Sequence, residues 1–230
     1  MYGKHNKKGL CMLFKRLYES IILSWKFLRI FFQLVRGAWY VSKLQHPIIS
    51  IFGSAKTQQS DQYAHEANKI AALFVEKGVS VLTGGGPGIM EAANCGAVLK
   101  GGDKTKITSI GISVSGLEGK NPCVQEYFQL DHFFARKWLL TNYSSGFVFF
   151  PGGFGTLDEL SDVLVLIQTK QMKQVPIVLI GKEYWQPFMD WISNEMVEHN
   201  LIKPEHLNLF SMTDDPEQAF CFVLGKCKIE

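Results

Sequence analysis

The chain has 230 residues, of which 47% are hydrophobic and 20% are charged, and its net charge is +3. This balance is typical of a folded globular protein and excludes a disordered chain. The length suffices for one α/β domain with a large core and one extension.

The cysteines and histidines show no spacing that would predict a covalent or metal framework. No CxxC pair, HxxxH pair or Cys/His cluster occurs among the five cysteines and six histidines. The sequence therefore predicts no disulfide framework and no metal site, and it favours a reducing, cytoplasmic location. The cysteines are Cys11, Cys95, Cys123, Cys221 and Cys227.

Residues 1–45 differ in charge from the rest of the chain. They contain nine basic residues and one acidic residue, a net charge of +8, so that residues 46–230 sum to −5. Residues 10–41 carry large apolar side chains at helical spacing, and their longest uncharged run is six residues. A transmembrane span needs about 20 apolar residues, and a signal peptide needs a clean apolar core, so neither is expected.

Two interpretations of this amphipathic helical extension remain open. It is either a helix packed on the body or across a dimer interface, or a helix that rests on an anionic membrane. In the second case residues 10–41 would make the protein peripheral to a membrane. The basic excess is confined to the extension and no nucleic-acid-binding motif occurs, so no nucleic-acid partner is expected.

From residue 46 onward, strand and helix patterns alternate along the chain. Short buried strands are predicted at residues 47–52, 79–82, 107–114, 127–130, 146–150, 175–180 and 209–212. Helices are predicted at residues 61–77, 87–100, 133–140, 157–167 and 183–199, with a last one capped by Asp214 or Asp215. Strands separated by helices of this length indicate a Rossmann-like α/β fold, with helices on both faces of a parallel sheet. Residues 1–45 are thus expected to form the extension, and residues 46–230 one Rossmann-like domain.

Three glycine-containing segments follow the carboxyl ends of predicted strands, at residues 53–54, 84–88 and 151–156. Carboxyl ends of parallel strands meet at one edge of the sheet, where ligands bind, so we expect one composite pocket. The first segment lacks the later glycines of the dinucleotide fingerprint GxGxxG, and no Gly-Lys-Ser/Thr follows the second. These absences disfavour NAD binding and ATP hydrolysis.

The third segment, PGGFGT, connects a buried strand directly to a helix. Free backbone N–H groups and the positive end of the helix dipole make such a turn an anion site. Thr156 adds a hydroxyl donor, and Glu159 lies one helical turn further on. A carboxylate beside a phosphate site is expected to face another part of the ligand, which suggests chemistry as well as binding.

Three motifs occur in order: TGGGPGIMEAAN at residues 83–94, ARK at 135–137 and PGGFGTLDE at 151–159. In these motifs the chain resembles the LONELY GUY (LOG) family of cytokinin riboside 5′-monophosphate phosphoribohydrolases, often labelled lysine decarboxylase-like. The resemblance covers roughly residues 48–224. It implies hydrolysis of the N-glycosidic bond of a nucleoside 5′-monophosphate, such as AMP or an N6-substituted AMP, to a free base and ribose 5-phosphate.

The resemblance also implies roles for particular residues. Arg136 and Glu159 would form the catalytic pair, without a cofactor or metal. Where many relatives have methionine shortly after the RK pair, this chain has Leu139-Leu140, which leaves the base preference open. The phosphate-gripping residues would be Gly152, Gly153, Gly155 and Thr156. Further substrate contacts would come from Ser54, Gly85, Gly86, Gly88, Met90, Glu91 and Lys137.

Other interpretations of the same residues compete with this one. Glu91 and Asn94 could do no more than cap or solvate the start of a helix. Arg136 and Lys137 could simply lie on a solvent-exposed helix face. The chain could also be a nucleotide or cofactor carrier of the same fold, although a carrier has no need of the Arg136–Glu159 pair. A decarboxylase would need a Schiff-base lysine for pyridoxal phosphate, and no lysine is convincingly positioned.

The family resemblance further implies a homodimer in which the second subunit completes the pocket. The apolar and aromatic helices around Trp138 and Leu164 would suit such an interface, or they could belong to the core.

Overall fold

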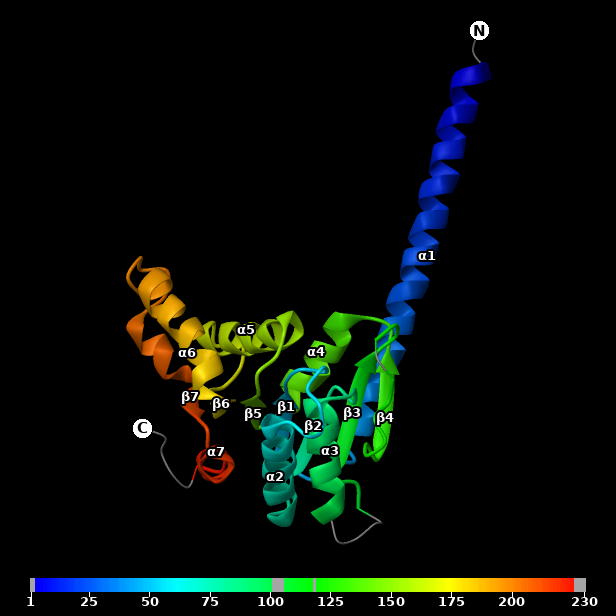
Figure 1. The fold of residues 1–230 in the computed structure, drawn as a ribbon. Helices are drawn as coiled ribbons and strands as arrows, with labels where there is room; N and C mark the ends of the chain where they lie inside the picture. The colour runs from blue at the N-terminus through cyan, green and yellow to red at the C-terminus, as the bar shows by residue number, and fades with distance from the viewer. Residues whose placement is uncertain (1–2, 101–105, 118, 226–230) are drawn as a thin grey trace.

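A computed structural model describes residues 3–100, 106–117 and 119–225, and its centre is a seven-stranded sheet (Figure 1). Every strand pair is parallel, and the strand order is β4-β3-β2-β1-β5-β6-β7. This arrangement confirms the predicted fold class. The strands are β1 (Ile48–Phe52), β2 (Ser80–Thr83), β3 (Ser109–Val114), β4 (Glu126–Leu130), β5 (Gly146–Phe149), β6 (Ile177–Ile180) and β7 (Ser211–Thr213).

The central strands are buried on both faces, which explains their continuous apolar sequences. All five residues of β1 are buried, and its neighbours are β2 on one side and β5 on the other. In register, Ile49 lies opposite Val81, and Ile51 lies opposite Val148. The β-branched side chains that favour extended structure therefore also supply the centre of the core.

Helices cover the two faces of the sheet in separate layers. One core cluster packs α2 (Gln62–Glu76), α3 (Ile89–Lys100) and α7 (Pro216–Val223) against the sheet. The other contains α4 (Phe133–Asn142), α5 (Phe154–Gln168), α6 (Lys182–Trp191) and the C-terminal end of the long helix α1 (Gly3–Val41). The apolar residues predicted for the 61–77 helix, such as Ile70 and Phe74, are fully buried.

The structure decides some helix ends that the sequence left open. Asp61, rather than Ser60, caps α2, and its Oδ1 accepts a hydrogen bond of 2.8 Å from the Tyr63 N–H. Asp215 caps α7, while Asp214 accepts from the Lys182 N–H at 2.7 Å. The single helix predicted at 183–199 consists of α6 followed by the π-helix η1 (Ile192–Val197), and the 3₁₀ helix η2 (Pro204–Leu209) precedes β7.

The N-terminal helix α1 has 39 residues, and its N-terminal half extends away from the sheet (Figure 1). Its C-terminal end is attached to the body because Val41 and Leu44 are buried in the core. Gly37 allows close approach, since a Cβ there would collide with Leu139 of α4. No helix within the described residues combines the length and apolar character needed to cross a membrane.

The strand order reverses direction between β1 and β5. From β1 the chain proceeds outward through β2, β3 and β4, and from β5 it proceeds outward on the other side through β6 and β7. The loops after β1 and β5 therefore diverge and leave a crevice at the carboxyl edge of the sheet. Such a topological switch point is where open α/β sheets bind ligands.

Candidate active site

A cleft of 390 Å³ lies at this switch point. All three glycine-containing loops contribute to it, so the expected composite pocket is present. Nine of its lining residues were site candidates from the sequence or belong to the same loops: Gly53, Ser54, Gly84, Gly86, Met90, Gly153, Gly155, Thr156 and Glu159. Arg136 reaches it from α4.

The PGGFGT loop forms one wall of the cleft and begins α5. Gly153 is the N-cap residue of α5, and no side chain caps it. The Thr156 and Leu157 N–H groups bond back to the Gly153 carbonyl at 3.0 and 3.1 Å. The preceding N–H groups of the first turn have no intrahelical carbonyl to bond and can donate to an anion, which the helix dipole also favours.

Gly152 supports this loop rather than lining the cleft. A Cβ at Gly152 would collide with the Thr156 hydroxyl, so the glycine lets that side chain lie against the backbone. Its carbonyl accepts a hydrogen bond of 2.5 Å from the Tyr184 hydroxyl. Gly152 therefore shapes the turn, and its predicted contact with a phosphate stays a prediction.

Glu159 is buried, with 4% of its surface exposed, yet it lines the cleft. Its Oε2 has no hydrogen-bond partner among the described residues. Burial raises the pKa of the Glu159 carboxyl to about 7, although the positive charges of Arg136 and Lys137 act in the opposite direction. A carboxyl group with such a pKa can hold or release a proton near neutral pH, which is typical of a catalytic group.

Arg136 enters the cleft from α4 and faces the second loop. Its Nε donates a hydrogen bond of 3.1 Å to the Ile112 carbonyl on β3. Gly84 makes room for it, because a Cβ there would collide with the guanidinium. Burial lowers the pKa of Arg136, opposed by the charge of Glu159, but a guanidinium keeps its proton at neutral pH. The cleft therefore contains a fixed cation beside a carboxyl group that can change its charge.

Lys137 does not line the cleft. Its Nζ lies 3.0 Å from Asp158 Oδ1 and 3.8 Å from Asp162 Oδ1 on α5. Burial lowers the pKa of Lys137, but the hydrogen bond to Asp158 and the charge of Asp162 outweigh it, so the pKa is raised. Lys137 thus links α4 to α5, and its predicted contact with substrate stays a prediction.

The GGGPG loop is shaped by two glycines that stay outside the cleft lining. Gly85 has φ +72°, and a Cβ there would lie 3.0 Å from the Gly111 Cα. Gly88 has φ +68°, and its Cβ would collide with the Ser54 carbonyl. Glu91 belongs to the first turn of α3 and is likewise not a lining residue. Of this loop's candidates, Gly86 and Met90 line the cleft.

A buried polar network holds the GGGPG loop from behind. Asn94 Oδ1 accepts hydrogen bonds from Thr83 Oγ1 at 2.8 Å and from Asn121 Nδ2 at 2.9 Å, and Asn94 Nδ2 donates to Ser109 Oγ. Asn121 Nδ2 also donates to the Gly86 carbonyl at 2.9 Å. Asn94 therefore acts as a buried structural anchor for the loop and neither caps nor solvates the start of α3.

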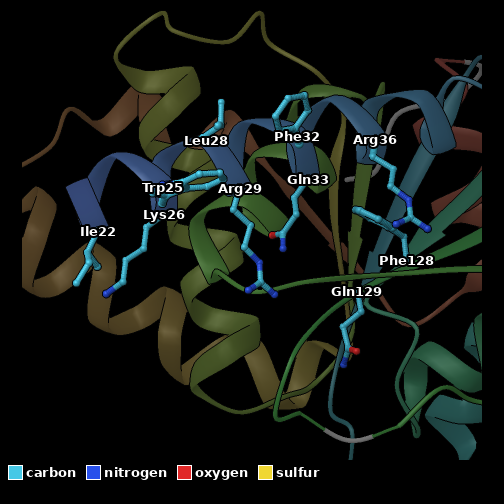
Figure 2. Close-up of a pocket in the computed structure, with 10 residues that line it drawn as sticks. All are labelled: Ile22, Trp25, Lys26, Leu28, Arg29, Phe32, Gln33, Arg36, Phe128 and Gln129. Atoms are coloured by element: carbon cyan, nitrogen blue, oxygen red, sulfur yellow. The ribbon is translucent and has the colours of Figure 1, made fainter. Parts of the chain in front are cut away.

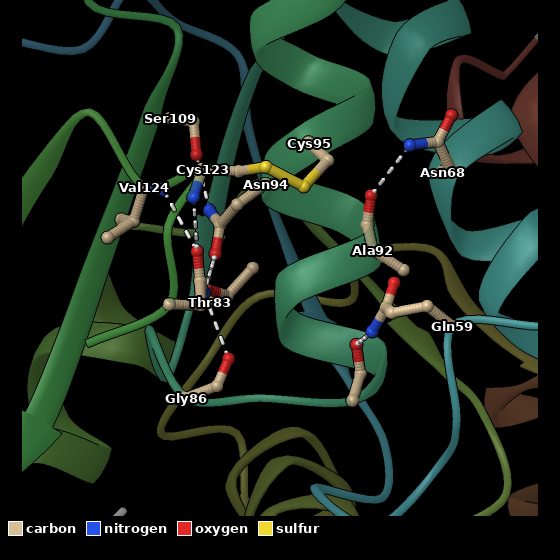
Figure 3. The surroundings of a disulfide bond; sticks show 12 residues. Gln59, Asn68, Thr83, Gly86, Ala92, Asn94, Cys95, Ser109, Cys123 and Val124 are labelled. Carbon is tan, nitrogen blue, oxygen red and sulfur yellow. Dashed lines mark hydrogen bonds between the residues drawn. A yellow bond between two sulfur atoms is a disulfide. The ribbon is translucent and has the colours of Figure 1, made fainter. Parts of the chain in front are cut away.

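A disulfide between Cys95 and Cys123 lies beside this network (Figure 3). The prediction that the cysteines form no disulfide is therefore wrong. The two residues are 28 positions apart, and only the packing of α3 against the loop before β4 brings them together. The cysteine argument for a reducing compartment fails with it. Within the described part of the chain, no group of three or more His, Cys, Asp or Glu residues could hold a metal ion.

Several lining residues were not predicted from the sequence. Ser113 could have been predicted, because it lies next to last in β3 and so at the same carboxyl edge of the sheet as the glycine loops. Phe133 and Leu117 give no chemical signal in the sequence. Lys56 and Asp158 are charged residues close to the recognised motifs. The remaining ones are Phe52 and Ala55.

Comparisons with known proteins agree with this geometry. The family model described as "possible lysine decarboxylase" matches residues 90–222. A probable cytokinin riboside 5′-monophosphate phosphoribohydrolase of Oryza sativa subsp. japonica is 27% identical over 169 residues, covering 73% of this chain and 73% of that protein. A pyrimidine/purine nucleotide 5′-monophosphate nucleosidase of Escherichia coli K12 is 25% identical over 177 residues, covering 74% of this chain and 38% of that protein.

Solved structures share the fold. The molybdenum cofactor carrier protein of Chlamydomonas reinhardtii has a TM-score of 0.58 and 22% identity, over 79% of this chain and 98% of that chain. At this level of identity, the likeness concerns the fold alone.

Proposed function

The chain belongs to the LONELY GUY (LOG) family, whose model carries the description "possible lysine decarboxylase", and from that premise we propose that it hydrolyses the N-glycosidic bond of a nucleoside 5′-monophosphate. The proposed substrate is AMP or an N6-substituted AMP, and the products are the free base and ribose 5-phosphate. The single observation that carries this proposal is the buried Glu159 carboxyl in the same cleft as the uncapped start of α5.

The 5′-phosphate binds at the start of α5 in this proposal. The backbone N–H groups after Gly153 and the Thr156 hydroxyl are the donors, and the helix dipole adds favourable charge. Gly153 and Gly155 keep the approach open, because a Cβ at either position would meet no atom within 4 Å. This end of the cleft then fixes the nucleotide at a distance from its reacting bond.

Glu159 acts on the ribose. As the bond between C1′ and the base nitrogen breaks, its electron pair goes to the base, and positive charge develops on the sugar ring. An ionised Glu159 stabilises that charge or removes a proton from the water that adds to C1′, and the base acquires a proton as it leaves. The nearby cation Arg136 holds the substrate or offsets negative charge on the leaving base.

The decarboxylase description receives little support from the cleft. Lys56 is the lysine among its lining residues, and it is exposed. A lysine that forms a Schiff base is activated by removal from water or by a neighbouring cation, and Lys56 is not shielded in this way. An absorbance band near ~400 nm from a bound pyridoxal group in the purified protein would support a decarboxylase instead.

The test is release of free base from a panel of nucleoside 5′-monophosphates, followed by chromatography, with unphosphorylated nucleosides as controls. We expect cleavage of AMP or an N6-substituted AMP, while adenosine is spared because it cannot use the start of α5. Binding of nucleotide without any base release would contradict hydrolysis and assign a binding or carrier role.

We further propose that two copies of the chain pair through the outer face of α4 and α5. Phe133, Phe134 and Trp138 on α4 are exposed, as are Phe154 and Val165 on α5. Contiguous exposed apolar side chains of this kind mark interaction surfaces. Leu164, in contrast, is partly buried against the core. Since Phe133 and Glu159 also line the cleft, a partner on this face would lie beside the site.

A further inference from the structure

The charged side of α1 faces the body. Arg29 Nε lies 2.7 Å from Asp131 Oδ2, and Gln33 Nε2 donates to the same oxygen at 2.6 Å. In the turn after the helix, Lys43 Nζ lies 3.4 Å from Glu126 Oε1. These contacts fix the rotation of the helix about its own axis.

A groove of 830 Å³ lies between this side of α1 and β4 (Figure 2). In Figure 2 the side chains of Lys26, Arg29 and Gln33 extend from one side of the helix. Those of Leu28 and Phe32 extend from the opposite side of the helix, and both residues border the rim of the groove. The body therefore lies on the side of Arg29 and Gln33, while Leu28 and Phe32 stay exposed.

That apolar side continues along nearly the whole helix. Its members recur every three or four residues, so they share one face of the helix, and each is exposed. At 1.5 Å per residue, the stripe is about 39 Å long. We call it the outer stripe; it consists of Leu13, Leu17, Ile21, Trp25, Leu28, Phe32, Val35 and Trp39.

Charge decides between the partners that could cover the outer stripe. Residues 1–45 carry nine basic residues and one acidic residue, Glu19, whose Oε1 lies 4.0 Å from Lys15 Nζ. Pairing with a second α1 would bring two strongly basic helices together, with few acidic groups to offset the repulsion. An anionic surface instead attracts the basic excess of this segment, although Arg29 and Lys43 already pair with Asp131 and Glu126 of the body.

We propose that α1 lies flat on a phospholipid bilayer with anionic headgroups, with the outer stripe in the interfacial layer. A helix with an exposed apolar stripe and an excess of basic residues is suited to this position, and no described helix could cross the membrane. Trp25 and Trp39 in the stripe are of the residue type that favours the interface.

The test is flotation of the full chain with vesicles of phosphatidylcholine alone or with phosphatidylserine added, at about 0.1 M and about 1 M salt. We expect the protein to float with the anionic vesicles, with roughly tenfold weaker binding at the higher salt concentration or without phosphatidylserine. Absence of flotation with anionic vesicles, or equal flotation with neutral ones, would overturn the proposal.

A matched pair of variants tests which face is bound. Leu17 in the outer stripe and Leu23, which lies about 120° away around the helix, are similarly exposed, at 57% and 53%. Both belong to the part of α1 that extends from the body, so neither change to glutamate disturbs the core. Leu17→Glu should weaken vesicle binding at least about tenfold, while Leu23→Glu, with the same change of charge, should weaken it by less than about threefold.

Equal losses in the two variants would show that charge alone binds the chain and would overturn the outer stripe as the contact. Sedimentation of the same variants tests whether a second copy of the chain, rather than a membrane, covers the outer stripe. If Leu17→Glu lowered the oligomeric state and wild-type protein did not float, the stripe would be an interface between copies of this chain, and the proposal would be wrong.

Discussion

The chemistry proposed here depends on how burial changes one carboxyl group. Glu159 and Glu66 are both removed from water enough to raise the pKa of each carboxyl, and each has an oxygen without a hydrogen-bond partner among the described residues. Only Glu159 faces the cleft, beside Arg136. Glu66 lies on α2 and accepts a hydrogen bond from Gln62. The difference between them is position, which makes Glu66 a suitable control.

Replacing Glu159 by glutamine should abolish most of the turnover. Glu159→Gln keeps the shape of the side chain but removes the negative charge, so it should lower kcat by roughly 10²–10⁴-fold. AMP should still bind, because the start of α5 is unchanged, and equilibrium dialysis would measure this. Glu66→Gln should leave kcat within about twofold. Wild-type turnover by Glu159→Gln would remove Glu159 from the mechanism.

The rate should depend on pH through Glu159. Because the ionised carboxylate is the active form and burial raises its pKa to about 7, kcat/KM should increase as the pH rises through about 7. The substrate phosphate titrates lower, with a pKa of about 6, so the two groups can be separated. A profile that is flat between about pH 6.5 and 8 would contradict this assignment.

The same pKa predicts a change in stability. The folded protein binds the Glu159 proton more tightly than the unfolded chain, whose ordinary pKa is 4.5. The stabilisation is therefore complete below about pH 4.5 and is lost as the pH rises to about 7. Urea unfolding of wild type and Glu159→Gln at several pH values would measure the free energy of unfolding. The wild type should lose stability relative to the variant over this interval, and parallel curves would contradict the prediction.

At the scale of elements, each wall of the cleft is a junction between a strand and a helix. The α5 junction is open at its surface, since Gly153 and Gly155 have no close neighbours. The α3 junction is closed from behind by Asn94, Asn121 and the disulfide. One junction is therefore free to approach a ligand, while the other is fixed in place by side chains.

Glycine substitutions at the two junctions should affect the free energy of unfolding differently. In Gly88→Ala, alanine would have to adopt a positive φ, and its Cβ would collide with the Ser54 carbonyl. The variant should therefore lower the free energy of unfolding by at least about 1–2 kcal/mol. Gly155→Ala meets open space and has no positive φ, so it should not destabilise the protein. Chemical denaturation of both variants measures the difference. Equal stability of the two would contradict the account of the GGGPG loop.

At the scale of the whole molecule, two exposed apolar surfaces belong to different elements of the described structure. The outer stripe belongs to α1, and the aromatic face of α4 and α5 lies beside the cleft. The first is flanked by basic residues, whereas the second includes residues next to the site. This contrast is why we assign a lipid surface to one and a second copy of the chain to the other.

The second surface predicts a dimer in solution. Sedimentation should give twice the 26.0 kDa mass of one chain. Trp138 on α4 and Trp191 at the end of α6 are similarly exposed, at 46% and 51%. Trp138→Glu should dissociate the dimer because it introduces a charge into the interface, while Trp191→Glu should not. A monomeric wild type, or equal dissociation by both variants, would contradict this interface.

The sequence by itself determined the alternation of elements and the location of the glycine loops. Apolar runs such as residues 48–52 form strands wherever they are buried on both faces, and the PGGFGT turn is a local signal that needs no distant partner. For the same reason, Glu159 and Arg136 could be selected as candidates before their surroundings were known.

Only the tertiary structure decided how these residues meet. The Cys95–Cys123 disulfide, the ion pair of Lys137 with Asp158 and the pKa of Glu159 all depend on elements that are distant in the chain and packed together. The same holds for the rotation of α1, which is set by the contacts of Arg29 and Gln33 with Asp131. Local sequence specifies an element and its apolar face, but packing decides what each side chain touches and how far it is removed from water.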